Sequence, residues 1–269
     1  MKSNIKKKLF LCYATTFLNF YPSIPPLSPD QLKTIGNKIW KNEGSQKKET
    51  LTWWNKGEPC ASMGIGHFLW YPKNVEQNFS QTFPDLLVFL KKNGVALPSW
   101  LKKNPAHAYC PWHTHEDFFA NFNHKKMQQL RDLLASTVDL QTQFIIKRSS
   151  AVLDDMLASM HEEGKKKHVK KQYYLMTQTA NGMYALIDYH NFKGQGTNPK
   201  ERYKNQGWGL LQVLERMNTN ISDTVIIQHF ANIATDLLEQ RVNNAPKSNN
   251  ETRFLAGWKN RIKTYVEPL

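Results

Sequence analysis

The fold is decided by the stretch Ser62-Met63-Gly64-Ile65-Gly66-His67-Phe68, which begins nineteen residues after Glu43. Before it, Ser28-Pro29-Asp30-Gln31 has the pattern of a helix start, with Ser as the N-cap, Pro at the first position and Gln at the third. Apolar residues at helical spacing predict that this helix continues to about Asn42, so that Glu43-Gly44 forms its exit. An acidic residue at a helix end is therefore followed by a glycine-rich segment that predicts a β-hairpin.

The rest of the chain is predicted to be mainly helical. A short strand is expected at Thr52-Trp53-Trp54, and the run 163–171 is interpreted as a solvated basic face. The predicted helices cover residues 85–92, 115–134, 140–160, 182–192, 207–217 and 221–242, with a C-terminal segment over 251–269. The expected fold class is mainly α (α+β): a single domain over 23–269, with a small β-hairpin beside the helix that ends at Glu43 and with extra C-terminal helices.

The formal net charge of the 269-residue chain is +14, which favours anionic partners such as nucleic acid, acidic lipid or an anionic glycan. The sequence has no zinc-finger, RNP or helix-turn-helix pattern, so no nucleic-acid partner is expected. No stretch after the N-terminal segment is long and apolar enough to span a membrane. We therefore expect a monomer without stable membrane insertion.

Residues 1–22 have the pattern of a signal peptide or another N-terminal targeting segment. Lys2 and the run 6–8 are basic, and residues 9–18 are mostly apolar. This pattern predicts a periplasmic or secreted protein; the alternative is a basic amphipathic helix packed on the body. Cys12 would be lost with the signal, which leaves Cys60 and Cys110, interpreted as two separate, partly buried thiols.

Glu43 lies in a segment rich in aromatic residues, which suits the cleavage of a glycosidic bond. That reaction needs a proton donor for the leaving oxygen, and a second group that acts on the other face of the sugar or stabilises charge there. The donor stays protonated most easily in a partly apolar pocket. The candidates to line such a pocket and to stack on sugar rings are Trp40, Trp53, Trp54, Phe68 and Trp70. The alternative is that Glu43 is an ordinary exposed residue at a helix end.

The order Glu43-Gly44, hairpin and Ser62-Met63-Gly64-Ile65-Gly66-His67 resembles phage-type lysozymes of the lysozyme-like superfamily. In that family the catalytic Glu precedes a Gly at the end of the first long helix, and the hairpin ends in a Thr-Ile-Gly-x-Gly-His motif. The resemblance covers about residues 28–70 and implies a bacterial glycoside hydrolase that cleaves the β-1,4 bonds of peptidoglycan. It implies that Glu43 is the general acid, that Ser62 replaces the family Thr and helps to hold a water, and that His67 braces the hairpin at the substrate site.

One position departs from the family pattern. The family has an Asp about six residues before the Thr, and the matching position here is Lys56. Glu58 is the candidate for the second carboxylate, with Glu49 as a more distant choice, and Glu58 is otherwise a plain acid in a turn. If Glu58 does not serve, the alternatives are a lytic transglycosylase with one essential acid, or a non-catalytic glycan-binding protein of the same fold.

A second landmark is the helix predicted ahead of Gly194. Lysozyme-like proteins often have a comparable central helix that faces the cleft, and this likeness makes Asp188, Tyr189 and Asn191 candidates for sugar contacts. The alternative is that the apolar residues of this helix are core and its polar residues are caps.

The segment that contains Tyr203 and Trp208 is dense in hydrogen-bonding and stacking groups, which is typical of a glycan subsite. The alternative for this segment is a structural turn. Three stretches are also similar to a family of secreted bacterial proteins, a likeness that extends over nearly the whole chain after residue 28: residues 64–72, 184–189 and 207–214.

Possible metal ligands occur at Cys110, His113 and His115, but no second ligand pair follows at a regular spacing. Thr114 is better interpreted as a helix N-cap, with Asp117 at the third helical position. No metal and no cofactor are therefore expected, and no dinucleotide loop or nucleophile motif is recognised in the sequence.

Overall fold

The computed structural model describes residues 25–77, 79–218 and 225–269, so the predicted signal segment and Cys12 lie outside the described residues. The described chain is mainly helical with two small antiparallel sheets, which confirms the predicted fold class. The helices are α1 (Pro29–Gly44), α2 (Phe83–Lys92), α3 (Ser99–Lys102), α4 (His115–Ala120), α5 (Lys125–Ser136), α6 (Val138–Ala158), α7 (Glu163–Thr177), α8 (Ala180–Lys193), α9 (Leu210–Arg216), α10 (Ile226–Asn244) and α11 (Thr252–Lys263). The strands are β1 (Thr52–Trp53), β2 (Ala61–Met63), β3 (Phe68–Trp70), β4 (Arg202–Tyr203) and β5 (Gln206–Gly207).

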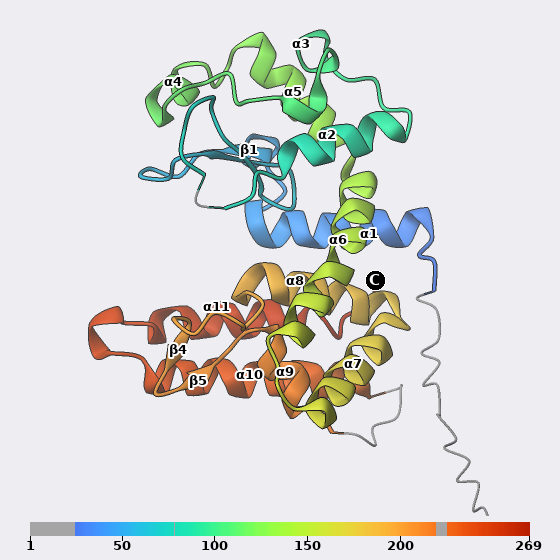
Figure 1. The fold of residues 1–269 in the computed structure, drawn as a ribbon, viewed down its shortest axis with the longest axis vertical. Helices are drawn as coiled ribbons and strands as arrows, with labels where there is room; N and C mark the ends of the chain where they lie inside the picture. The colour runs from blue at the N-terminus through green and yellow to red at the C-terminus, as the bar shows by residue number, and fades with distance from the viewer. Residues whose placement is uncertain (1–24, 78, 219–224) are drawn as a thin grey trace, which may run out of the picture.

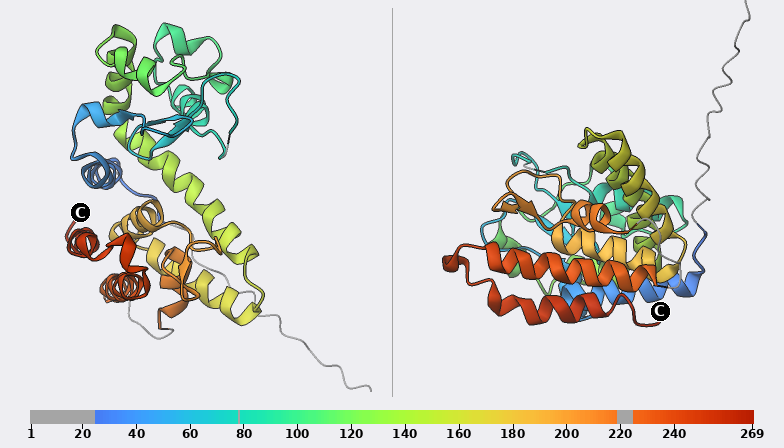
Figure 2. Two further views of the ribbon diagram at one scale, coloured as in Figure 1. Left: turned by 90° about the vertical axis from the view of Figure 1, so that its left-hand side faces the viewer. Right: turned by 90° about the horizontal axis from the view of Figure 1, so that it is seen from below.

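These elements form two lobes joined by the long helix α6 (Figure 1). The upper lobe holds the β1-β2-β3 sheet and helices α2 to α5, and the lower lobe holds α7 to α11 with the β4-β5 hairpin. Figure 2 shows α6 running diagonally from one lobe to the other, with α1 lying between the lobes. Gly36 permits close packing of α1 on α6, because a Cβ there would lie 2.4 Å from Thr142 Oγ1 and 2.6 Å from Val138 Cγ1.

Helix α1 begins as predicted. The Ser28 hydroxyl accepts from the Gln31 N–H at 3.2 Å, and the Gln31 side chain accepts from the Ser28 N–H at 2.9 Å. The helix continues through Gly44 and ends at Ser45, which adopts the left-handed conformation with φ 52°. Glu43 therefore belongs to the last turn of α1, one residue further into the helix than the sequence suggested.

The glycine-rich turn between β2 and β3 packs against α6 rather than against open space. Gly64 has a φ of +70°, which confirms that a glycine is needed there, and a Cβ on it would lie 2.2 Å from Gln141 Oε1. The buried Gln141 accepts from the Ile65 N–H at 3.0 Å and donates to the Leu134 carbonyl at 2.7 Å. The close approach at Gly64 is thus to Gln141, which fixes the turn to the helix that joins the lobes.

Two predicted segments differ from the structure. The helix expected over 115–134 is divided into α4 and α5, because Asn121 donates its side-chain amide to the Asp117 carbonyl at 2.8 Å and the chain turns there. The basic run 163–171 is the first part of α7, whose apolar side buries Val169 and Tyr173. The N-cap at Thr114 is confirmed, since its hydroxyl accepts from the Asp117 N–H at 3.1 Å.

The two described cysteines, Cys60 and Cys110, are both free and buried, in keeping with the prediction of separate thiols. Burial raises the pKa of Cys110 to about 12, a rise only partly opposed by the hydrogen bond from the Trp112 backbone. Both side chains belong to the core of the upper lobe rather than to a reactive site.

Candidate active site at the end of helix α1

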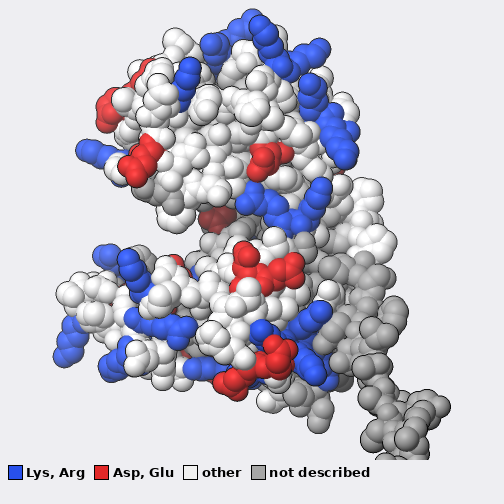
Figure 3. Space-filling model, in the orientation of Figure 1, with Lys and Arg blue, Asp and Glu red and all other residues white. Residues whose placement is uncertain are grey.

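Glu43 lies where the two lobes meet. It pairs with Arg261 of α11 in the lower lobe, and its Oε2 is 3.9 Å from Nδ1 of His67 in the β2-β3 turn of the upper lobe. The Glu43 side chain keeps 20% of its exposure and His67 keeps 50%. Figure 3 shows the surface hollowed between the two lobes on the side where α1 ends, and we call this hollow the notch. An acid with partial access to solvent is thus held between residues of the two lobes.

Arg261 is held in turn by Asp188, which is fully buried on α8. The Arg261 Nε donates to Asp188 Oδ2 at 2.8 Å and its Nη2 donates to Oδ1 at 2.9 Å, a bidentate pairing. Burial lowers the pKa of Arg261, but the hydrogen bonds and charges of Asp188 and Glu43 outweigh this effect and raise it above its usual range. Arg261 is therefore a permanent cation beside Glu43.

Asp188 also accepts hydrogen bonds from two neutral groups. The Tyr265 hydroxyl donates to Asp188 Oδ2 at 2.8 Å, and the Asn42 amide donates to Oδ1 at 3.1 Å. Asn42 also donates to the Tyr184 hydroxyl at 2.9 Å, and burial raises the pKa of Tyr184. Asp188 was expected to contact sugar, whereas the structure places it beneath the partner of Glu43, with its oxygens occupied by the protein.

The expected second carboxylate is not in contact with Glu43. Glu58 is exposed in the β1-β2 loop, where its Oε1 accepts from the Asn55 side chain at 3.0 Å. The β1-β2 loop and the β2-β3 turn leave opposite ends of β2, so this strand separates Glu58 from His67. Ser62 is 9% exposed and donates to the Trp53 carbonyl at 3.3 Å, so its hydroxyl is already used within the sheet.

The aromatic residues expected on the cleft are mostly interior. Trp54 is buried and donates its Nε1–H to the Glu58 carbonyl at 2.8 Å, whereas the adjacent Trp53 is 41% exposed. Trp70 is fully buried and donates to the Ala108 carbonyl at 2.9 Å. These two buried tryptophans hold the upper lobe together and offer no free ring face to a sugar, so Trp53, the last residue of β1, is the expected tryptophan whose ring is exposed.

Tyr189 and Trp208 are likewise packed inside the lower lobe. Tyr189 is fully buried and donates its hydroxyl to the Trp208 carbonyl at 2.8 Å. Burial raises the pKa of Tyr189. Tyr203 is partly buried, and its hydroxyl donates to Glu251 Oε1 at 2.9 Å. The structure assigns these residues to the support of α8 and the β4-β5 hairpin instead of to direct sugar contact.

Asn191 is the expected sugar contact that does line a cavity. It is exposed, and the cavity of about 260 Å³ lies between the β2-β3 turn, α6 and α8. Gly66 and Phe68 border it on the upper lobe, and His190 borders it on the lower lobe. Burial lowers the pKa of His190, with a smaller opposing effect from Asn191, which favours a neutral imidazole there. Gly66 is the chain neighbour of His67, although His67 and Glu43 themselves do not line this cavity.

A layer of cations and aromatic rings lies under the lower wall of the notch. Lys193 Nζ is 3.3 Å from the centre of the Trp258 ring and 4.0 Å from that of Phe192, and Arg261 is 4.3 Å from Phe192. Burial, reinforced by the charge of Arg241, lowers the pKa of Lys193 to about 6. This layer connects the residues around Glu43 to the β4-β5 hairpin.

Sequence reasoning missed Arg261, the residue that defines the setting of Glu43. A signal for it does exist in the sequence: Arg261 falls between Trp258, Ile262 and Tyr265 on the apolar side of a helical pattern. A charged residue in that position predicts a buried partner. The pattern does not identify that partner, because Asp188 and Glu43 are far away in the chain.

Comparison of the chain with protein-family models, with curated proteins and with solved structures gives no match. None of the described helices combines the length and the apolar character needed to cross a bilayer. The described residues also contain no group of three or more His, Cys, Asp or Glu side chains placed to share a metal ion. The functional argument therefore depends on the geometry around Glu43.

Proposed function

We propose that this protein cleaves the β-1,4 bonds of a peptidoglycan-type glycan, with Glu43 as the general acid. The observation that carries the proposal is the placement of Glu43: a partly exposed carboxyl at the end of α1, paired with Arg261 of the lower lobe and 3.9 Å from His67 of the upper lobe. An acid in such a place can give a proton to the oxygen that leaves the sugar. The exposed ring of Trp53 on the upper lobe and Asn191 on the lower lobe supply groups suited to sugar contact.

The role of Arg261 follows from the chemistry of a general acid. Glu43 has to give a proton to the leaving oxygen when it acts, so its carboxyl cannot stay bound to the Arg261 guanidinium at that moment. A glycan that fills the notch competes with Arg261 for the carboxyl oxygens. The proposal therefore includes the displacement of Glu43 from Arg261 when substrate binds.

The surface charge suits an anionic substrate. The chain carries a formal net charge of +14, and Lys and Arg side chains appear on both lobes in Figure 3. Such a charge draws a protein toward a polyanionic wall from a distance of about a Debye length. The proposal also needs the chain to reach that wall, and the predicted N-terminal signal segment would serve this purpose.

A second candidate is a non-catalytic glycan-binding protein of the same fold. Two contacts favour it: Glu43 is paired with Arg261, and the carboxyl of Glu58 is occupied by Asn55. A lytic transglycosylase, which needs one acid, is intermediate between the two candidates. It fits the absence of contact between Glu58 and Glu43 and releases products with an anhydro sugar end.

The test is the release of muropeptides from purified peptidoglycan by the wild type and by Glu43→Gln. Loss of a general acid lowers the rate roughly a hundredfold or more. Glu76→Gln is the matched control, because it makes the same exchange at an exposed position of the upper lobe that belongs to no candidate site. Glu58→Gln loses activity if the enzyme is a hydrolase that uses Glu58, and keeps it if Glu43 is the one essential acid. Mass spectrometry of the released sugar ends distinguishes hydrolysis products from anhydro products.

Three results would count against catalysis by Glu43. The wild type releases no muropeptides, Glu43→Gln is as active as the wild type, or Glu76→Gln loses as much activity as Glu43→Gln. Binding of the wild type to peptidoglycan without any release supports the glycan-binding candidate instead.

A further inference from the structure

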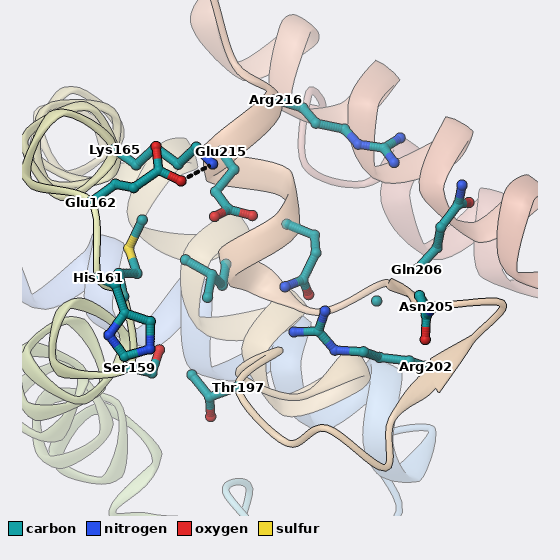
Figure 4. Close-up of a pocket in the computed structure, with 14 residues that line it drawn as sticks. Ser159, His161, Glu162, Lys165, Thr197, Arg202, Asn205, Gln206, Glu215 and Arg216 are labelled. Atoms are coloured by element: carbon teal, nitrogen blue, oxygen red, sulfur yellow. Dashed lines mark hydrogen bonds and ion pairs between the residues drawn. The ribbon is translucent and has the colours of Figure 1, made fainter.

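A second cavity lies in the lower lobe, between the α6-α7 connection, α9 and the β4-β5 hairpin (Figure 4). Its volume is about 390 Å³, near the lower end of the range of small-molecule sites. Its walls are mostly polar and charged, and it shares no lining residue with the cavity that Gly66 and Asn191 line. The charged and titratable groups that line it are His161, Glu162, Lys165, Arg202, Glu215 and Arg216.

Several of these groups are already satisfied by the protein. Lys165 pairs with Glu162 at 2.6 Å, the interaction drawn as a dashed line in Figure 4. Arg216 donates its Nη1–H to the Gln240 side chain at 2.9 Å. The amide of Gln212, also in the wall, donates to the Gly196 carbonyl at 3.0 Å. These contacts leave few charges of the cavity wall in need of a partner.

Two opposite charges remain. Within the described part of the chain, the side chains of Arg202 on β4 and Glu215 on α9 make no hydrogen bond or ion pair. Figure 4 shows both head groups turned toward the cavity from different walls. Glu215 is exposed as a residue, yet burial of its carboxyl group raises its pKa, against the opposing charges of Lys165, Arg202 and Arg216. The geometry leaves both head groups at the cavity wall without a protein partner in the described residues, so each is available to a ligand.

The arrangement of charge selects the class of ligand. A purely anionic ligand would meet the repulsion of Glu215 and Glu162, and a purely cationic ligand would meet that of Arg202 and Arg216. We propose that this cavity binds a small zwitterion, a free amino acid or a short peptide, with its ammonium group at Glu215 and its carboxylate at Arg202. The planar guanidinium suits a carboxylate because it can donate two parallel hydrogen bonds. This site is independent of glycan cleavage at Glu43.

The experiment is isothermal titration of the full-length protein with Ala-Ala, N-acetyl-Ala-Ala and Ala-Ala amide, with alanine and Ala-Ala-Ala as length variants. We expect saturable binding of at least one unblocked compound. Blocking either end removes one charge-assisted contact, which weakens binding roughly ten- to hundredfold. In Glu215→Gln the acetyl block has little further effect, and in Arg202→Gln the amide block has little further effect.

Glu163→Gln is the matched control, because Glu163 lies on α7 close to the cavity but pairs with Lys166 and does not line it. Its binding is expected to equal that of the wild type. The proposal is overturned if no unblocked compound in the series gives saturable heat at millimolar concentration. It is also overturned if the two blocks weaken binding equally in the wild type and in both site variants, since the charges would then not be read by these side chains.

Discussion

Replacing Lys193 by Met is expected to stabilise the protein at pH 7. Lys193 is the last residue of α8, and it is only 8% exposed. Its ammonium group lies between the rings of Trp258 and Phe192, and the neighbouring charges are Arg241, Arg261 and Glu251. Because Glu251 is already bound by Arg241 at 2.7 Å, Lys193 has no carboxylate of its own.

The size of the effect follows from the pKa of Lys193, which falls from 10.5 to about 6. The gap between 10.5 and pH 7 corresponds to about 5 kcal/mol in favour of the unfolded state, where the group takes up a proton freely. With a pKa of about 6 the folded side chain is mostly neutral at pH 7, so ring contacts of an ammonium form do not offset this cost, which stays on the order of 5 kcal/mol. Methionine keeps an unbranched apolar stem in the same space without a charge to bury.

The sign of the pH dependence is also fixed. Between pH 6 and 10.5 the unfolded state binds one more proton at Lys193 than the folded state does. The free energy of unfolding therefore rises with pH in this window, by about 1.4 kcal/mol per pH unit from this one group. The rise is absent in Lys193→Met, so the two proteins differ most at the acidic end of the window and least at the alkaline end.

The assay is urea unfolding followed by circular dichroism at several pH values between about 6 and 9. Lys33→Met is the control, because Lys33 is exposed on α1 and its removal should leave both the stability and its pH slope unchanged. The reasoning is refuted if Lys193→Met is less stable than the wild type at pH 7, or if the two stability curves run parallel across the pH range.

Two further predictions concern two glycines of the upper lobe and the pairing of Arg261. Gly57→Ala should lower the free energy of unfolding by about 1 kcal/mol, because its φ is positive but its surroundings are empty. Gly64→Ala should lower it by about 3 kcal/mol, because the new Cβ also collides with Gln141; equal losses in urea unfolding would contradict this account. Arg261→Met should cost about 3–5 kcal/mol because it leaves the buried charge of Asp188 without its cation, and adding Asp188→Asn should restore part of the loss in a double-mutant cycle; strictly additive losses would refute the coupling.

The parts of the fold that the sequence predicted are those set by local interactions. The start of α1 follows from a capping box within four residues, and the turn at Gly64 follows from a backbone conformation that glycine adopts readily. The placement of Glu43 at the end of that helix is local in the same sense. These features need no knowledge of what lies across the core.

The choice between Trp53 and Trp54 shows where local reasoning stops. In a strand, successive side chains point to opposite faces, so one of the two is buried and the other exposed. Which one is buried depends on the pairing of Trp53 with Ser62, and that register is set by the partner strand. The same limit applies to Tyr189, whose burial depends on how α8 packs against the lower lobe.

The Arg261 network lay beyond local reasoning because its members come from three distant helices, and it explains how Glu43 can be held and still be released. Arg261 makes one contact to Glu43 and two hydrogen bonds to Asp188, at 2.8 and 2.9 Å. In the proposed reaction, a substrate that took the Glu43 carboxyl would leave Arg261 with its bidentate partner Asp188, so no buried cation would be left unpaired. Tyr265 and Asn42 hold Asp188 in place throughout. The buried Asp188 thus lowers the free-energy cost of separating Glu43 from Arg261, which is the property that the proposed general acid requires in this position.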